Sequence, residues 1–240
     1  MVYLSQSVHL QFAGLVLGFV GWLITASISG VNDWRIWYVD NQTVVTGGLA
    51  WVGVWRVCFN SHILDSAEIC KSISLTDSFT PPEIAAAQVL CMVAIGVGVV
   101  ANLLAGHAVR NGIFEVDSGH VRLTFVIAGS LYWLTAACSL VPVFWNMNSV
   151  LANLTIDFPP DFYLPSAPVK QEVGAGIGIG IGSGCLLIDG TVPVAVFGWK
   201  GASSLLLTWS NQSNDGEEEE ALFGIPQRTH CSLEPSLITA

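Results

Sequence analysis

Residues 84–105 read IAAAQVLCMVAIGVGVVANLLA, a run without Asp, Glu, Lys or Arg. A helix needs about 20 apolar residues to cross the roughly 30 Å hydrocarbon layer of a membrane, so this run predicts a transmembrane helix. Three further windows qualify, at residues 8–30, 123–144 and 173–199, the last with one interior charge at Asp189. Backbone polar groups in lipid must be satisfied within the segment, which favours helices. The sequence therefore predicts an all-α membrane protein, a four-helix transmembrane bundle.

The composition of the whole chain supports insertion in a membrane. Among 240 residues, 11% are charged and 52% are apolar, and the mean hydropathy is +0.61. Soluble domains carry about 25% charged residues, and disordered chains are poor in apolar ones, so both classes are excluded for most of the chain. The net charge is −10 with eight Lys and Arg, which argues against a nucleic-acid partner. The five histidines are scattered and no paired carboxylates occur in the windows, so we expect no enzyme, metal or cofactor.

The connections between the windows are unequal in length. The first loop spans about residues 31–83 and the third about residues 145–172, while the polar tail at 201–240 contains four consecutive glutamates and is expected to be disordered. A signal peptide is the alternative interpretation of the first window. No Lys or Arg precedes that window, and its apolar run exceeds the 7–15 residues typical of a signal peptide, so we expect a retained helix.

Cysteines and glycosylation signals indicate which side of the membrane each loop faces. Cys58 and Cys70 share an aqueous loop, and they can form a disulfide if that loop faces an oxidising compartment; two unrelated free thiols are the alternative. Candidate N-glycosylation sites at Asn41 and Asn153 lie in the first and third loops, although Asn211 in the tail shows that the motif also occurs by chance. Basic residues divide equally between the two sides. We therefore expect both loops outside and both termini in the cytoplasm.

The first loop predicts a small β module. Residues 35–39 are rich in β-formers, and Gly47-Gly48 marks a turn. Residues 50–58 alternate roughly and predict a second strand, and residues 69–75 predict another. A short antiparallel sheet is not stable alone, but a disulfide and a helix bundle beneath it can support it.

The same loop contains, in order, Trp34, then Gly53-Val54-Trp55, then Cys58 and Cys70. This set resembles the claudin signature, in which a Trp, a Gly-Leu-Trp triplet and two Cys follow one another. With the four windows and the long first loop, the resemblance covers roughly residues 1–200. It implies a small extracellular antiparallel β-sheet, drawn mostly from the first loop with one strand from the third. Trp34 and Trp55 are expected to pack where this sheet meets the membrane.

Besides Val54 in place of the usual Leu, two other positions depart from the claudin pattern. Claudins usually carry an Arg where the first loop enters the second helix, and this chain has Gln88 there. Claudins often end in Tyr-Val, which PDZ scaffolds bind. Ala240 is a poor filler of the terminal pocket of a PDZ domain, which argues against such a scaffold.

The resemblance implies a structural protein of the plasma membrane at tight junctions. It would associate with itself and other claudins, within the lipid membrane and across the gap between cells, to seal or tune the paracellular route. Residues 161–165, Asp-Phe-Tyr-Leu-Pro, are similar to the adhesive stretch of the family. Phe162, Tyr163 and Pro165 are expected to form an exposed apolar knob, and packing of these aromatics on the sheet is the alternative.

Charge on the first loop is expected to set which ions pass. Lys71 directly follows the second Cys, a frequent selectivity position in the family, and would favour anions or block cations. Asp65 and Glu68 lie nearby with the opposite charge, so ion preference stays open. Two other functions also stay open: an accessory subunit of a channel or receptor that forms no strands, and an adhesion or trafficking protein of the peripheral-myelin type.

A glycine at every second position from Gly174 to Gly182 looks like a phosphate-binding loop. The spacing is not G-x-G-x-x-G and no strand precedes it, so we interpret the run as close helix packing by Gly174, Gly178 and Gly182 on one face. Asp189 is expected near the cytoplasmic interface, because a charge inside the membrane costs at least about 2.5 kcal/mol.

Overall fold

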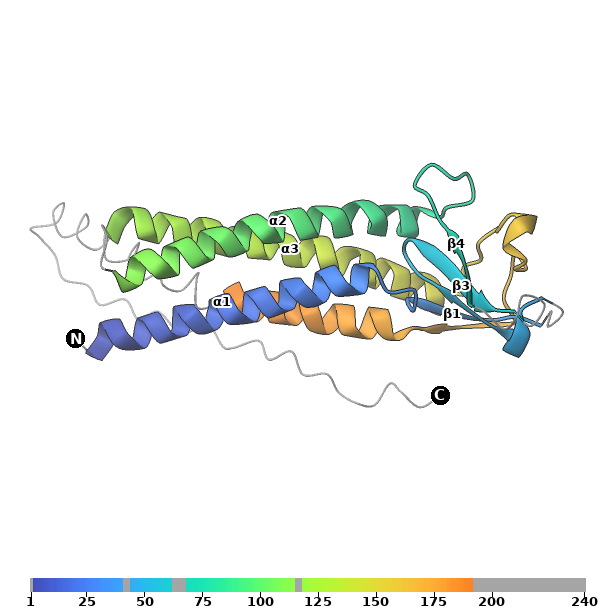
Figure 1. Cartoon of the computed structure of the whole chain (residues 1–240), viewed down its shortest axis with the longest axis horizontal. Helices are drawn as coiled ribbons and strands as arrows, with labels where there is room; N and C mark the ends of the chain where they lie inside the picture. The colour runs from blue at the N-terminus through green and yellow to red at the C-terminus, as the bar shows by residue number, and fades with distance from the viewer. Residues whose placement is uncertain (1, 41–43, 62–67, 115–117, 192–240) are drawn as a thin grey trace, which may run out of the picture. The chain divides into compact units, whose positions relative to one another are not determined.

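The computed structural model describes residues 2–40, 44–61, 68–114 and 118–191 (Figure 1). Three helices are long and apolar enough to cross a membrane, and a fourth, Ala175–Thr191, is shorter. The long helices are α1 (Val2–Ser29), α2 (Pro82–Ile113) and α3 (Ser118–Leu151), and α2 and α3 pack side by side. The predicted four-helix membrane fold is confirmed. The tail at 201–240 and the end of the fourth window lie outside the described residues.

Helices α2 and α3 are longer than the apolar windows that predicted them. They contain 32 and 34 residues, or about 48 and 51 Å, whereas the hydrocarbon layer is roughly 30 Å thick. The third loop was expected to begin at residue 145, but α3 continues to Leu151. A hydropathy window ends at polar residues, yet Asn146 and Ser149 are buried inside the protein and continue the helix.

A five-stranded antiparallel sheet lies at one end of the helices (Figure 1). The first loop supplies β1 (Arg35–Tyr38), β2 (Leu49–Val52), β3 (Arg56–Asn60) and β4 (Glu68–Ser72). The third loop supplies β5 (Lys170–Val173), which pairs with β1 and completes the order β4-β3-β2-β1-β5. Two short 3₁₀ helices, η1 (Thr46–Gly48) and η2 (Pro160–Phe162), lie in the same two loops. The expected sheet, with one strand from the third loop, is therefore present.

The prediction of a single strand at residues 50–58 is wrong. The segment forms two strands, β2 and β3, joined by a turn at Gly53-Val54-Trp55. The Gly53 N–H donates to the Arg56 carbonyl at 2.9 Å and closes the turn. A Cβ on this glycine would come 2.7 Å from Asn32 Cα, so only glycine fits without a shift. Val and Trp are good β-formers, and their presence concealed the turn in the sequence.

The glycine run packs closely, but mainly on a different face from the expected one. A Cβ at Gly180 would come 2.8 Å from Val143 Cγ2, and one at Gly184 would overlap Leu140. A Cβ at Gly178 or Gly182 would meet nothing within 4 Å. Gly174 contacts Asp33 but precedes the helix, and the close-packed helical face is Gly176, Gly180 and Gly184. A glycine at every second position occupies both faces of a helix, so the sequence alone could not choose between them.

Gly184→Leu is expected to destabilise the protein by about 1–3 kcal/mol, because the new side chain overpacks the contact with Leu140 on α3. Gly182→Leu is the matched control, since it makes the same change on the open face of the same helix. Both substitutions raise helix propensity equally, so the difference between them reports packing. Thermal unfolding of the purified proteins measures it, and equal stability of the two variants would contradict the observed helix face.

Candidate functional site

One face of the sheet is buried under the third loop. Trp37 of β1 packs edge-on against Phe158 at 5.2 Å between ring centroids. Phe158 stacks on Phe162 at 5.4 Å, and Phe79 packs edge-on against Phe162 at 5.2 Å. These rings form one core with buried residues of β2 and β3. The third loop is therefore folded onto the sheet.

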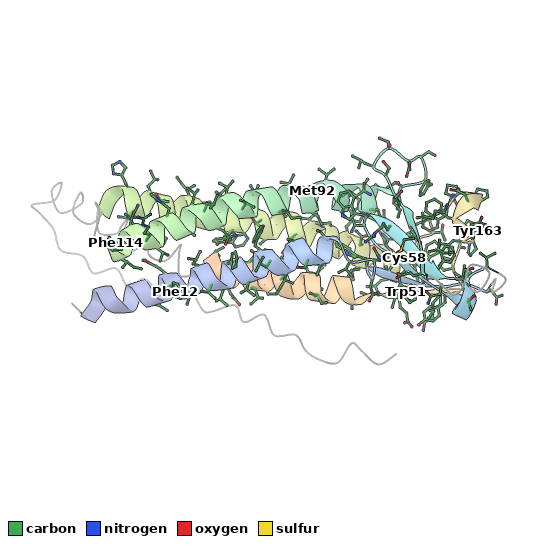
Figure 2. All side chains as sticks on the ribbon, in the orientation of Figure 1. Phe12, Trp51, Cys58, Met92, Phe114 and Tyr163 are labelled. Carbon is green, nitrogen blue, oxygen red and sulfur yellow. A yellow bond between two sulfur atoms is a disulfide. The ribbon has the colours of Figure 1, made fainter. Side chains whose placement is uncertain are left out.

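Of the three residues that were expected to form an exposed knob, one is buried in this core and two are not. Phe162 is only 5% exposed, so its expected exposure is wrong: it takes the alternative role of packing against the sheet. Tyr163 is 52% exposed and Pro165 is partly exposed. Figure 2 shows Tyr163 beyond Cys58 and Trp51, at the end of the sheet region away from the helices.

The backbone at Tyr163 has an uncommon conformation. Its φ is 56° and its ψ is 14°, in the left-handed region, directly after η2. Its N–H donates to the Pro160 carbonyl at 3.1 Å. A left-handed conformation costs a residue other than glycine about 1–2 kcal/mol. The stacked rings around Phe162 hold the loop in place and offset this cost.

Trp34 lies where the sheet meets the helices. It is 1% exposed, and its indole Nε1 donates to the Ile28 carbonyl in the last turn of α1 at 3.0 Å. It shares a buried cluster with Val54, and the partly buried Trp55 packs against that cluster. The members from the helices are Ala87, Cys91, Val143 and Ile177. The signature residues thus join the β2–β3 turn to the bundle.

Gln88 links α2 to the sheet. Its Nε2 donates to the Val54 carbonyl at 2.9 Å and to the Ile73 carbonyl at 3.0 Å. The first bond holds the β2–β3 turn, and the second holds the chain directly after β4. A neutral amide therefore makes a two-point contact at the position where the claudin pattern has Arg.

A buried ion pair, which the sequence analysis did not identify, fixes β1 to two helices. Arg35 is 1% exposed, and its Nη2 lies 3.0 Å from Glu83 Oε1 at the start of α2. Arg35 also donates to Asn146 Oδ1 of α3, at 2.6 Å from Nη2 and 3.2 Å from Nε. Asn146 Nδ2 donates to the carbonyls of Glu83 and Pro142. Burial lowers the pKa of Arg35, and the hydrogen bond and charge of Glu83 oppose that shift.

The opposite face of the sheet contains the disulfide. Cys58 of β3 and Cys70 of β4 are directly opposite each other and are bonded. At the other edge, Glu172 of β5 accepts from Tyr38 at 2.9 Å and pairs with Lys170 at 2.6 Å. The hydrogen bonds from Lys170 and Tyr38 lower the pKa of Glu172. Such exposed pairs contribute little to stability.

The charged candidates for ion selectivity do not share one face of the sheet. Lys71 is partly buried and lies on the same face of β4 as Ile69, which packs against the aromatic core. Glu68 is exposed and lies on the face of Cys70. Asp65 is outside the described residues, as is the sequon at Asn41. Asn153 is exposed directly after α3.

The known relatives agree on one family. No protein-family model matches the sequence. The chain is 30% identical to the claudin-like protein ZF-A89 of Danio rerio over 194 residues, which are 78% of this chain and 86% of the relative. The chain belongs to the claudin family. This claudin is also 29% identical to claudin-3 of Canis lupus familiaris over 77% of its length and 81% of the relative. It is 27% identical to claudin-4 of Homo sapiens over 77% of its length and 84% of the relative.

The family and the fold together assign a general role. Claudins are structural proteins of tight junctions and not enzymes, so this claudin is a membrane protein of the tight junction. Its apolar helices and its disulfide-linked sheet fit that assignment. Interaction with other claudins at the junction follows from the same relationship.

Proposed function

We propose that this claudin associates with itself and other claudins, within one membrane and across the intercellular gap, to form strands that seal or tune the paracellular route. Both sheet-forming loops face outward and both termini are cytoplasmic. The exposed Tyr163 is the observation that carries this proposal, because it presents an aromatic ring outside the apolar helices.

The way in which Tyr163 is held supports adhesion between facing membranes. A ring that served only the core would be buried with Phe162, and this one is instead 52% exposed. Its left-handed backbone is a local cost, and such costs are often found where a side chain must be presented for function. The packed rings beneath it reduce the loss of freedom on contact, which favours association.

The orientation is supported by the sheet itself. The disulfide needs an oxidising compartment, so β3 and β4 are expected to face the secretory lumen and later the cell exterior. Strand β5 pairs with β1 of the same sheet, so the third loop faces the same side.

Ion selection is proposed to depend on β4 and the segment before it. Glu68 is exposed and would attract cations, whereas Lys71 lies partly buried on the other face of the strand. The two charges therefore act on different surfaces and need not cancel. Asp65 remains a candidate by its position in the sequence.

Expression in cells that lack endogenous claudins tests the proposal. Freeze-fracture imaging is expected to show continuous strands where two expressing cells touch. Surface protein without strands would contradict autonomous strand formation. A co-purified channel with altered gating would then support the accessory-subunit function, and trafficking of a partner without strands would support the peripheral-myelin type.

Tyr163→Ala is expected to weaken association between facing membranes at least ten-fold while leaving the amount of surface protein unchanged. Burial of an aromatic side chain of this size stabilises a contact by about 1.5–3 kcal/mol, and 1.4 kcal/mol is a factor of ten. Aggregation of suspended expressing cells measures the effect. Tyr163→Phe is the matched control, because it keeps the ring and removes only the hydroxyl. Unchanged aggregation of the Ala variant would remove Tyr163 from the adhesive contact.

A further inference from the structure

The segment Asn153-Leu154-Thr155 forms an exposed turn at the end of α3. Residues 151–155 are all exposed. Asn153 has a φ of 53°, and its N–H donates to the Val150 carbonyl at 3.0 Å. The Leu154 N–H donates to the Ser149 carbonyl at 3.0 Å, so the turn caps the last carbonyls of the helix. Backbone hydrogen bonds hold this turn, and both polar side chains of the sequon reach solvent.

The turn lies beyond the apolar window that predicted α3. The apolar window ends at Phe144, and Asn153 lies nine positions further along the chain. At 1.5 Å per residue this places Asn153 about 13 Å past the window. The amide is therefore expected to be in water and not in the hydrocarbon layer.

The sheet places this turn on the side of the membrane where a disulfide forms. The chain after Asn153 continues without a spanning helix to β5, which pairs with β1. Strands β1 to β4 belong to the same sheet and contain the Cys58–Cys70 disulfide. A disulfide of this kind forms in the oxidising lumen of the secretory pathway. Asn153 is thus on the lumenal side during synthesis.

Two leucines of the turn have exposed side chains. Leu151 is 68% exposed and Leu154 is 48% exposed. A bulky, solubilising glycan on Asn153 would cover both.

We propose that Asn153 carries an N-linked glycan. The donor is an oligosaccharide attached to a lipid diphosphate. A bond forms between Asn153 Nδ2 and the anomeric carbon of the first sugar, while the bond from that carbon to the diphosphate oxygen breaks. The amide nitrogen loses one proton, and the lipid diphosphate leaves. Thr155 supplies the hydroxyl that the acceptor motif requires.

The test uses the full chain in cells, with Asn41→Gln and Asn211→Gln so that Asn153 is in the one remaining sequon. The expected result is a single-step decrease in gel mobility, which peptide N-glycosidase treatment reverses. Mass spectrometry is expected to show conversion of Asn153 to Asp by that treatment. Unchanged mobility of this chain in the membrane fraction, with or without the enzyme, would overturn the proposal.

Four variants separate the sequon from general effects on folding. Asn153→Gln and Thr155→Ala are expected to abolish the mobility step, whereas Thr155→Ser preserves the motif and the step. Asn148→Gln is the matched control, because Asn148 is an exposed amide on α3 outside any sequon. The readout is independent of strand formation. An N-terminal tag on the same chain gives the orientation. Unchanged mobility with a tag that is inaccessible on intact cells would overturn the glycan alone, whereas an accessible tag would overturn the proposed orientation as well.

Discussion

Glu83→Gln is expected to lower the free energy of unfolding by about 3–5 kcal/mol and to retain most of the protein inside the cell. Glu83 is 4% exposed, and its carboxylate lies 3.0 Å from the guanidinium of Arg35, which is 1% exposed. A neutral amide leaves that cation buried without a counter-charge, and the cost of an uncompensated buried charge exceeds the gain from the remaining hydrogen bonds with Asn146. Strand β1 would lose its ion pair with α2, and the Gln88 hydrogen bonds would remain.

Chemical unfolding of the purified protein and labelling of surface protein measure this effect. Glu68→Gln is the matched control, since Glu68 is an exposed carboxylate on the sheet that contains Arg35, and its replacement is expected to change stability by less than about 0.5 kcal/mol. Adding Arg35→Gln to Glu83→Gln removes the unpaired charge and is expected to recover part of the loss. Equal stability of the Glu83 and Glu68 variants would contradict a stabilising role for the pair.

The helices could be predicted because burial in lipid requires long apolar segments, and the sequence contains four. The ends of the helices could not be predicted, because the last turns of α3 are buried against the sheet and contain polar residues there. Asn146 there meets the buried Arg35 from a segment 111 positions away in the chain. An average of hydropathy over a window of residues counts Asn146 only as a polar residue and contains no information about its partner. The helix continues because Arg35 and Glu83 satisfy its side chain.

The sequence identified which residues belong to the site, but it did not predict which of their side chains are buried and which are exposed. Phe162 and Tyr163 are neighbouring aromatics with similar apolar area, and the sequence does not distinguish the buried ring from the exposed one. The left-handed turn after η2 makes that choice. Likewise, the motif of Gly53 and Trp55 was recognised, but its role as a turn depends on the approach of Asn32, which no local pattern records.

No local sequence pattern indicates the buried ion pair. Arg35 looked like one member of a strand, and Glu83 looked like an acidic residue at the start of a helix, where such residues are common. The two are 48 positions apart and meet only because the fold brings β1 to the first turn of α2. Pairing them requires the topology of the sheet, which the sequence alone did not give.

Replacement of both disulfide cysteines, Cys58→Ala with Cys70→Ser, is expected to lower stability by about 3 kcal/mol. The bond closes a short loop, with a separation of 12 positions, and it joins the edge strand β4 to β3. Strand β4 pairs with one neighbour in the described sheet, so besides that single ladder it is held by the covalent link, the packing of Ile69 and the Gln88 bond to the Ile73 carbonyl. Without the link, the unfolded chain gains freedom and β4 detaches first.

Hydrogen exchange distinguishes this local effect from general destabilisation. Amides of β4 are expected to exchange faster in the variant, while those of α2 and α3 keep their protection, because opening of an edge strand need not unfold the helices. A reducing agent should reproduce the loss in the wild-type protein and leave the variant unchanged. Cys91→Ala is the control for the change of residue type, since Cys91 is a buried free thiol in α2. If β4 kept its protection in the double variant, Ile69 and the ladder to β3 would be sufficient to hold the strand, and the disulfide would serve the folding process more than the folded sheet.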